Sequence, residues 1–150
     1  MARPKKLTLD FFVHDAFAST DIKIRRLEKR HRCEGYSTFF KLLELLCQHD
    51  GMRLPLDDIG VLEILADDFN LRDATHLTTI IQDCVEIGLL DRQLWQSERV
   101  VFSQGLYQRY MTRLEDRKQA ALRQKRSKEA KSLTDRIIEV ESQVITRDNL

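Results

Sequence analysis

Basic side chains, gathered in three segments, are the residues whose type and spacing best suit a defined chemistry, the binding of phosphate. They occur at Arg3, Lys5 and Lys6, in residues 21–32 with a net charge of +4, and in residues 109–131 with a net charge of +6. Lys and Arg neutralise the phosphates of a nucleic acid, so these segments predict its electrostatic footprint. The phosphate-contact candidates are Lys5, Lys6, Lys23, Arg26, Arg30, Arg117, Arg123, Lys125, Arg126 and Lys128.

A second reading of these segments is that they are solvated helix faces with no ligand. The whole chain of 150 residues has a net charge of only +1, which suggests no partner by itself. The uneven distribution of charge therefore carries the argument. The excess of bases over acids is largest in residues 109–131, and there the solvated-face reading is the weaker of the two.

Residues 57–91 have the opposite charge, with nine acids and Arg72 as the only base, a net of −8. A helix is predicted in their second half, and its outward face carries side chains able to contact base edges, namely Arg72, Thr75, Thr79 and Gln82. Asp83 and Glu86 would face phosphates if this helix lay flat on DNA. An end-on approach would avoid that repulsion and use the positive end of the helix. An acidic docking face for a protein is the alternative.

Patterns for catalysis or for metal binding are missing from the sequence. There is no GxxxxGK[ST] and no HExxH, and the four histidines stand apart in sequence, at His14, His31, His49 and His76. Cys84 lies on an apolar stripe without a base in register, and Tyr107 and Tyr110 share a helical stripe typical of core residues. We therefore expect a protein that is not an enzyme, with no catalytic residue, metal or cofactor.

The elements that position these side chains are mostly helices. Helix N-caps are predicted among Ser19, Thr20 and Asp21, at Asp57 or Asp58, and at Asp73, and helix ends at Gly35, Gly51, Asn70 and Gly88. The stretch "MRLPL" reads as a short edge strand, and residues 89–103 as either a small hairpin or a helical turn followed by one strand. The predicted helices cover residues 19–35, 36–51, 57–70, 73–88 and a long segment from 104.

This order predicts a mainly α fold, a winged helix-turn-helix with a small β hairpin or short strands and a long C-terminal helix. Residues 1–115 would form the winged-helix domain with its N-terminal arm, and residues 116–150 a basic helical extension and flexible tail. In such a fold the helix at 57–70 crosses the DNA backbone, the helix at 73–88 lies in the major groove, and the hairpin is the wing. Residues beyond 132 are expected to be mobile in a monomer or to pack on a second copy, as in a homodimer.

Four stretches of the chain resemble the N-terminal winged-helix domain of replication organisers of phages, prophages and plasmids, much of which is catalogued as a domain of unknown function. They are "MARPKKLTLDFF", "DIKIRRLEKRHRCEGYSTFFKLLELL", "VEIGLLD" and "VVFSQGLYQRY", and the resemblance spans residues 1–115. The most specific pieces are the "MARPKK" opening and the S-x-G-x-x-x-R-Y run from Ser103 to Tyr110. Such proteins often carry further domains, so a loader-binding domain is absent from this chain or not included in it.

The resemblance implies binding of double-stranded DNA in replication or in its control, with replication proteins as partners, and it supplies no catalytic residue. A transcriptional regulator of the same fold and a protein-interaction scaffold are the alternatives. The N-terminus lacks an apolar run after its charges, and no stretch reaches the roughly 18 apolar residues of a membrane span. We therefore expect a cytoplasmic protein without a membrane partner.

Overall fold

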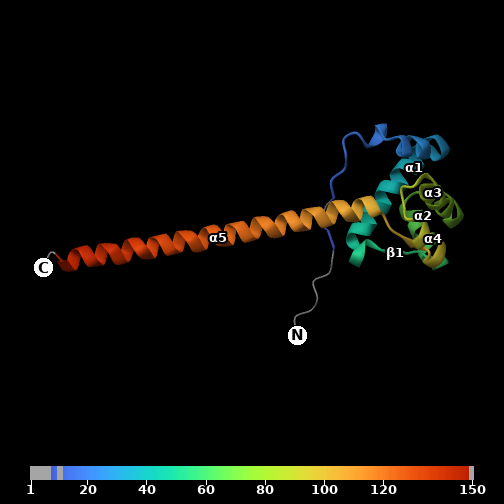
Figure 1. The fold of residues 1–150 in the computed structure, drawn as a ribbon. Helices are drawn as coiled ribbons and strands as arrows, with labels where there is room; N and C mark the ends of the chain where they lie inside the picture. The colour runs from blue at the N-terminus through green and yellow to red at the C-terminus, as the bar shows by residue number, and fades with distance from the viewer. Residues whose placement is uncertain (1–7, 10–11, 149–150) are drawn as a thin grey trace. The chain divides into compact units, whose positions relative to one another are not determined.

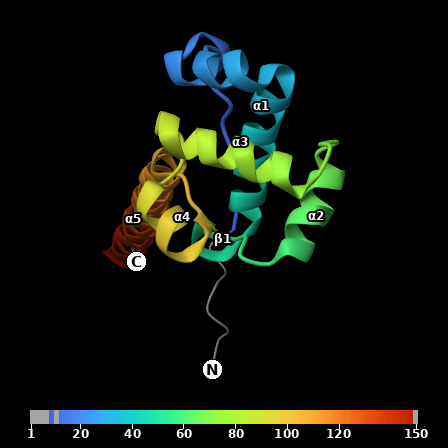
Figure 2. The same ribbon diagram turned by 90° about the vertical axis from the view of Figure 1, so that its right-hand side faces the viewer.

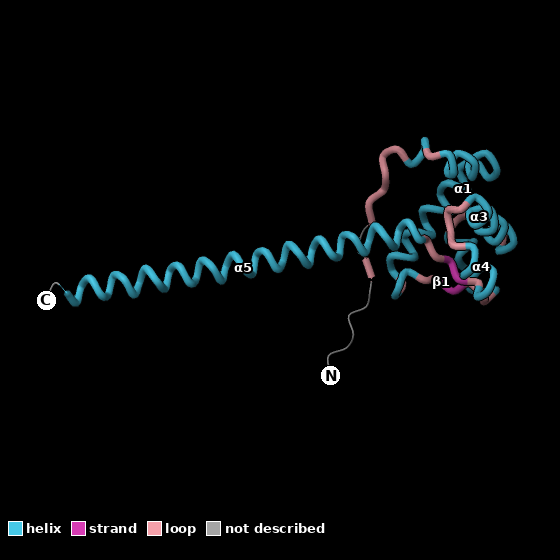
Figure 3. Tube along the Cα trace, viewed as in Figure 1, coloured by secondary structure: helices cyan, strands magenta, loops and turns pink. Residues whose placement is uncertain are grey.

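The computed structural model describes residues 8–9 and 12–148, so the candidates Lys5 and Lys6 lie outside the described residues. It is mainly helical with one small sheet, as predicted (Figures 1 and 3). The elements are η1 (Ala18–Thr20), α1 (Ile22–Gln48), η2 (Asp50–Met52), β1 (Leu54–Pro55), α2 (Ile59–Asp68), α3 (Ala74–Ile87), α4 (Arg92–Glu98), β2 (Val100–Val101) and α5 (Gln104–Asp148).

The chain divides into two compact units. The first ends at Gln108 and contains every element up to the start of α5, and the second begins at Arg109 and consists of the rest of α5. The boundary predicted from sequence, between residues 115 and 116, stays a prediction about domains.

Carboxylates cap the helices at the predicted positions. Asp21 accepts hydrogen bonds from the backbone N–H groups of Lys23 and Ile24 at the start of α1, and Asp58 accepts one from Gly60 at the start of α2. Such caps satisfy backbone donors that have no partner within the helix. Gly88 ends α3 in the left-handed conformation, with φ 87°, because a residue without Cβ adopts it at little cost.

The predicted break between the first two helices is present, but it lies three residues before Gly35. The chain kinks inside α1 at Arg32, where φ is 54° and ψ is −141°. Gly35 is buried just after the kink, and a Cβ at this position would lie 2.9 Å from His31 Cβ and 3.1 Å from Leu27 Cγ. Gly35 therefore serves close packing rather than termination, because the kink folds the next turn against the preceding helix.

Residues 89–103 follow the second of the two predicted alternatives. They form helix α4 and then strand β2, and β2 pairs antiparallel with β1 through Leu54↔Val101 and Pro55↔Val100. The two strands are thus partners from distant parts of the chain, and the predicted small hairpin is not formed. Asp91 caps α4 by accepting a hydrogen bond from Leu94 N. This cap stabilises a helix at the place where the sequence predicted either a hairpin or a single helical turn.

The core of the first unit forms where α3 crosses α1 and contacts α2 (Figure 2). The predicted inner stripe of α3 is fully buried: Leu77, Ile80, Ile81 and Cys84 each have 0% of their surface exposed, and Val85 has 2%. Burying one such side chain stabilises the fold by roughly 1.5–3 kcal/mol. Because this stripe fills one side of α3, the opposite side is fixed as its outward face.

Helix α5 begins at Gln104, as predicted, and continues to Asp148, well past the point where the sequence pattern thins. Within the second unit, side chains from Glu115 to Thr146 are exposed. The helix therefore presents two distinct surfaces to solvent, a basic one in residues 117–131 and an apolar stripe further along.

The kink generates a stability prediction. Gly35→Ala should lower the free energy of unfolding by about 1–3 kcal/mol, because the new methyl overlaps His31 and must displace packed atoms. Urea unfolding of the purified chain measures this.

The matched variant is Arg32→Gly at the kink itself. It should stabilise by up to about 1 kcal/mol, because relief of a strained φ exceeds the entropic cost of glycine. Destabilisation by Arg32→Gly, or none by Gly35→Ala, would show that the kink does not have the described geometry.

Candidate nucleic-acid interface

Helices α2 and α3 form a helix-turn-helix corner. Asn70 adopts the left-handed conformation expected from the sequence, with φ 56°, and Leu71 N donates to Ala66 O at 2.8 Å to close the end of α2. Two residues later the Asp73 carboxylate accepts from His76 N at 2.7 Å and starts α3. The sequence stretch between the helices thus carries all the signals for a tight turn.

Three of the four predicted base-contact residues are exposed, Thr75 and Thr79 on the outward face of α3 and Arg72 in the turn before it. The Arg72 side chain retains 78% of its accessible surface. Gln82 is half-buried, and its Oε1 accepts from the indole Nε1 of Trp95 at 2.9 Å. Because Trp95 is buried, Gln82 has a structural role: it accepts the hydrogen bond of an indole N–H that would otherwise lack a partner.

The two acids predicted to repel phosphate are paired with α1. Arg30 Nη1 lies 2.5 Å from Asp83 Oδ1 and 3.3 Å from Glu86 Oε2, and His31 Nε2 lies 2.5 Å from Asp83 Oδ2. The hydrogen bonds to Asp83 and Glu86 raise the pKa of Arg30, so its guanidinium stays charged. The far end of α3 therefore carries less uncompensated negative charge than its sequence suggests.

A second His–carboxylate contact lies beside the first. His76 Nε2 is 3.0 Å from Glu34 Oε2, and the rings of His31 and His76 are 6.2 Å apart between centroids. The geometry of this close contact is not that of a hydrogen bond. Histidines that stand apart in sequence thus share one side of the α1–α3 contact.

The remaining α1 candidates divide into a capping residue and an exposed one. Lys23 Nζ donates to Gly88 O at 3.0 Å and so binds the carbonyl end of α3, where a cation is favoured. Arg26 is exposed, like its neighbours Arg25 and Lys29. Lys23 and Arg30 both contact α3 or its C-terminal end, whereas no such contact of Arg26 is seen among the described residues.

The N-terminal end of α3 is already occupied by a carboxylate. The hydrogen bond from His76 N lowers the pKa of Asp73 below its ordinary value of 3.8, and the nearby charge of Arg72 lowers it further. An anion approaching end-on would meet this carboxylate. At the other end of α3, the pairing of Asp83 and Glu86 with Arg30 offsets part of the negative charge that the sequence predicted there.

The basic segment of α5 carries its candidates on exposed side chains. Arg123, Lys125, Arg126 and Lys128 all lie on the solvent-exposed part of the helix, as does Arg117. Lys125 Nζ is 4.0 Å from Glu129 Oε1, a loose pair one helical turn away. Such an exposed pair contributes little, so the segment keeps its positive charge available.

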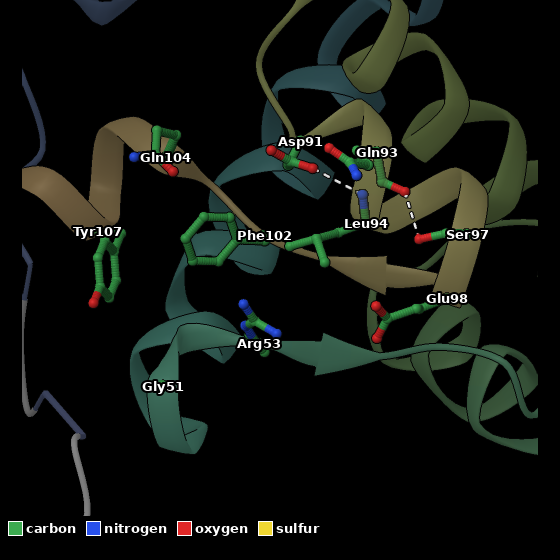
Figure 4. Close-up of a pocket in the computed structure, with 10 residues that line it drawn as sticks. All are labelled: Gly51, Arg53, Asp91, Gln93, Leu94, Ser97, Glu98, Phe102, Gln104 and Tyr107. Carbon is green, nitrogen blue, oxygen red and sulfur yellow. Dashed lines mark hydrogen bonds between the residues drawn. The ribbon is translucent and has the colours of Figure 1, made fainter.

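A cavity of about 590 Å³ lies elsewhere in the first unit, between η2, α4 and the start of α5 (Figure 4). Arg53 lines it, with its Cζ atom 5.9 Å from the centroid of the Phe102 ring, and the Tyr107 ring lies 5.4 Å from the Phe102 ring. Asp91 and Glu98 also line it, and these carboxylates oppose a phosphate ligand. The cavity is therefore a poorer candidate for nucleic acid than the surface of α3.

Cys84 is a core residue with no nucleophilic character. Burial raises the pKa of its thiol to about 12, so it is protonated at neutral pH. Within residues 8–9 and 12–148, no cluster of three or more His, Cys, Asp or Glu side chains is placed to hold a metal ion.

Sequence analysis did not identify the α1–α3 ion pairs. The signal was available, because residues 21–32 carry net +4 and residues 57–91 net −8. Two oppositely charged helices in one small domain attract each other, and this attraction competes with phosphate for Arg30.

Helix-turn-helix packing, a two-stranded antiparallel sheet and a basic helix define a small, mainly helical protein with an exposed α3 face. The chain belongs to the Lin1244/Lin1753-like N-terminal family, whose sequence model matches residues 11–106. It is 30% identical over 118 residues to an uncharacterized phage-related protein, Lin1244/Lin1753, of Listeria innocua serovar 6a. The match covers 79% of this chain and 38% of that protein, so the chain spans little more than a third of the relative's length.

No solved structure matches the chain. In the described part of the chain, none of the helices has the length and apolar character needed to cross a membrane.

The ion pairs generate a prediction that separates the two acids. Asp83→Ala should lower the free energy of unfolding by about 1–2 kcal/mol, because it removes the hydrogen-bond partner of the half-buried His31. Glu86→Ala should cost less than about 0.5 kcal/mol, because this acid is half exposed and pairs at the surface. Equal losses in urea unfolding would contradict the geometry.

The cap of α3 generates a pH prediction. The folded pKa of Asp73 is below its unfolded value, so its stabilising contribution is present above the unfolded pKa and is lost as pH falls through the folded pKa. Asp73→Asn retains a capping oxygen without a titrating group. Between about pH 5 and pH 2, urea midpoints should therefore fall more for the parent than for this variant. Parallel midpoints would contradict the assignment.

Proposed function

We propose that this protein is a DNA-binding winged-helix module in which α3 is the recognition helix. The observation that carries the proposal is the exposure of Thr75 and Thr79 on the outward face of α3 and of Arg72 in the turn before it. At the far end of α3, Arg30 pairs with Asp83 and Glu86, and His31 contacts Asp83. A helix of this kind fits the major groove and contacts base edges with its outward side chains.

The proposed fold is a winged-helix variant. Helices α2 and α3 take the places of the two helices of a helix-turn-helix, and β1 pairs with β2 as the sheet of such domains requires. In this proposed variant, α4 replaces the hairpin wing, because it forms within residues 89–103 where the hairpin was one of the predicted alternatives. This substitution leaves the wing's usual contact with the DNA backbone to another basic segment.

The basic segment of α5 is the proposed source of non-specific affinity. Its exposed Arg123, Lys125, Arg126 and Lys128 can neutralise phosphates, which positions a protein on DNA without reading sequence. Lys5 and Lys6 are proposed to add to this contact, on the basis of sequence alone.

The role we favour is replication initiation or its control in a phage, prophage or plasmid. The phage-related description of the Listeria innocua protein supports a mobile-element setting, and the resemblance to replication organisers supports replication within it. A transcriptional regulator would need the same recognition helix and is the second candidate.

The third candidate, a non-enzymatic scaffold, has its own supporting observation. Helix α2 exposes Ile59 and Ile64, at 64% and 63% of their surface, among several acids. Such a face suits a protein partner better than DNA. Binding assays with duplex DNA separate this scaffold from the two DNA-binding candidates.

Fluorescence anisotropy with DNA from upstream of the gene, from its origin and of random sequence tests the proposal. Affinity should fall steeply with salt, because each neutralised phosphate releases counterions. The joint change of Arg123, Lys125, Arg126 and Lys128 to Glu should weaken binding to all three duplexes about equally. The matched control exchanges Arg for Lys and Lys for Arg at these four positions and should bind like the parent.

Arg72→Ala, Thr75→Ala and Thr79→Ala should instead change the preference among sequences, by about 1–3 kcal/mol for a good base contact. Gln96→Ala, an exposed change on α4, is the control and should leave the preference unaltered. A parent chain that binds no duplex at low salt would refute DNA binding and leave the scaffold as the function.

A further inference from the structure

Apolar side chains in the second unit follow a strict heptad spacing. Ala130, Leu133, Ile137, Val140 and Val144 recur at alternating intervals of three and four along α5. Leu133, Ile137 and Val140 leave 58–59% of their surface exposed, and Val144 leaves 52%. A 3-4-3-4 repeat puts all five on one stripe of the helix, which is the pattern of a coiled-coil seam.

We propose that residues 130–144 of α5 form a parallel, in-register, two-stranded coiled coil with a second copy of this chain. The positions usually called a hold Ala130, Ile137 and Val144, and the positions called d hold Leu133 and Val140. Ile137 and Val144 at a, with Leu133 at d, favour two parallel strands over higher oligomers, and Val140 is the d residue that departs from this preference. The occupant of the stripe is therefore the same stripe of another molecule.

Charges beside the stripe match this arrangement. Arg136 occupies position g, and Glu141 occupies position e of the next heptad, so a parallel pair places each Arg136 next to Glu141 of the other copy. Within its own helix Glu141 has only apolar neighbours at the positions three and four residues away, Ile137, Ile138, Val144 and Ile145. Its natural counter-ion is thus on the second copy.

The seam has a defined start. One heptad earlier, the a and d positions hold Arg123 and Arg126, whose charges cannot be buried against their own copies. The seam is then about 22 Å long at 1.5 Å per residue, which predicts a weak dimer that forms with rising concentration. The two basic segments would run side by side into this seam.

This inference does not depend on the proposed function, because the seam residues are apolar and distinct from the DNA candidates. A dimer would nevertheless double the positive charge offered to one duplex. Self-association is therefore measured without DNA, and DNA affinity in a separate assay, so that either idea can fail alone.

Sedimentation equilibrium of the whole chain over increasing concentration gives the first test. The parent should show a monomer–dimer equilibrium, and Ile137→Asp should weaken it by at least about tenfold, because a charge replaces a seam residue. Ile138→Asp is the matched control, since the adjacent isoleucine is equally exposed at 58% but lies off the seam. A parent that stays monomeric at about 1 mM, or equal losses in both variants, would overturn the proposal.

Charge exchange gives the second test. Arg136→Glu and Glu141→Arg should each weaken the dimer, and the double variant should restore it, because the swapped charges again face each other. Additive losses in the double variant would overturn the paired arrangement.

Orientation is tested with Leu133→Cys in a Cys33→Ser background, which removes the exposed native thiol and leaves the buried Cys47 and Cys84. Mild oxidation should link two copies through residue 133, since only a parallel, in-register pair brings these positions together. A dimer by sedimentation that does not cross-link would overturn the parallel arrangement.

Discussion

The first unit depends on how α3 is held by its neighbours. Its apolar stripe is completely buried against α1 and α2, and its acidic end is bound by Arg30 and His31. The first interaction fixes which face of α3 points outward, and the second removes much of the negative charge from that face. The far end of α3 therefore carries less uncompensated negative charge than its sequence suggests, and the charge of Arg30 on α1 is committed to that pairing.

Local signals in the sequence predicted the local structure well. The caps at Asp21, Asp58 and Asp73 and the left-handed ends at Asn70 and Gly88 were all confirmed, because each depends on a few neighbouring backbone groups. The buried stripe of α3 was also predictable, since helical periodicity alone defines it. The extent and placement of the helix-turn-helix corner follow from these two kinds of evidence.

Features that depend on distant residues were not predictable in the same way. Glycine is a residue type typical of a helix end, but Gly35 is not one. Glycine suits this position because a side chain there would be too close to Leu27 and His31. The sequence predicted that Gln82 contacts a base edge, but its Oε1 accepts a hydrogen bond from Trp95, thirteen positions away. Arg30, predicted as a phosphate contact, likewise pairs with Asp83 and Glu86 on α3. These partners lie far apart in the sequence, so the order of residues does not reveal them.

The pairing of β1 with β2 has a consequence for the newly made chain. Leu54 meets Val101 only after α2, α3 and α4 have been synthesised, so β1 has no partner strand while those helices emerge. Closing such a long loop is slow compared with forming local helices, and an unpaired strand edge invites aggregation. Strand β1 has only two residues, and Pro55 lacks a backbone N–H. Before β2 is made, β1 therefore has few backbone hydrogen-bonding groups with which a strand of another molecule could pair.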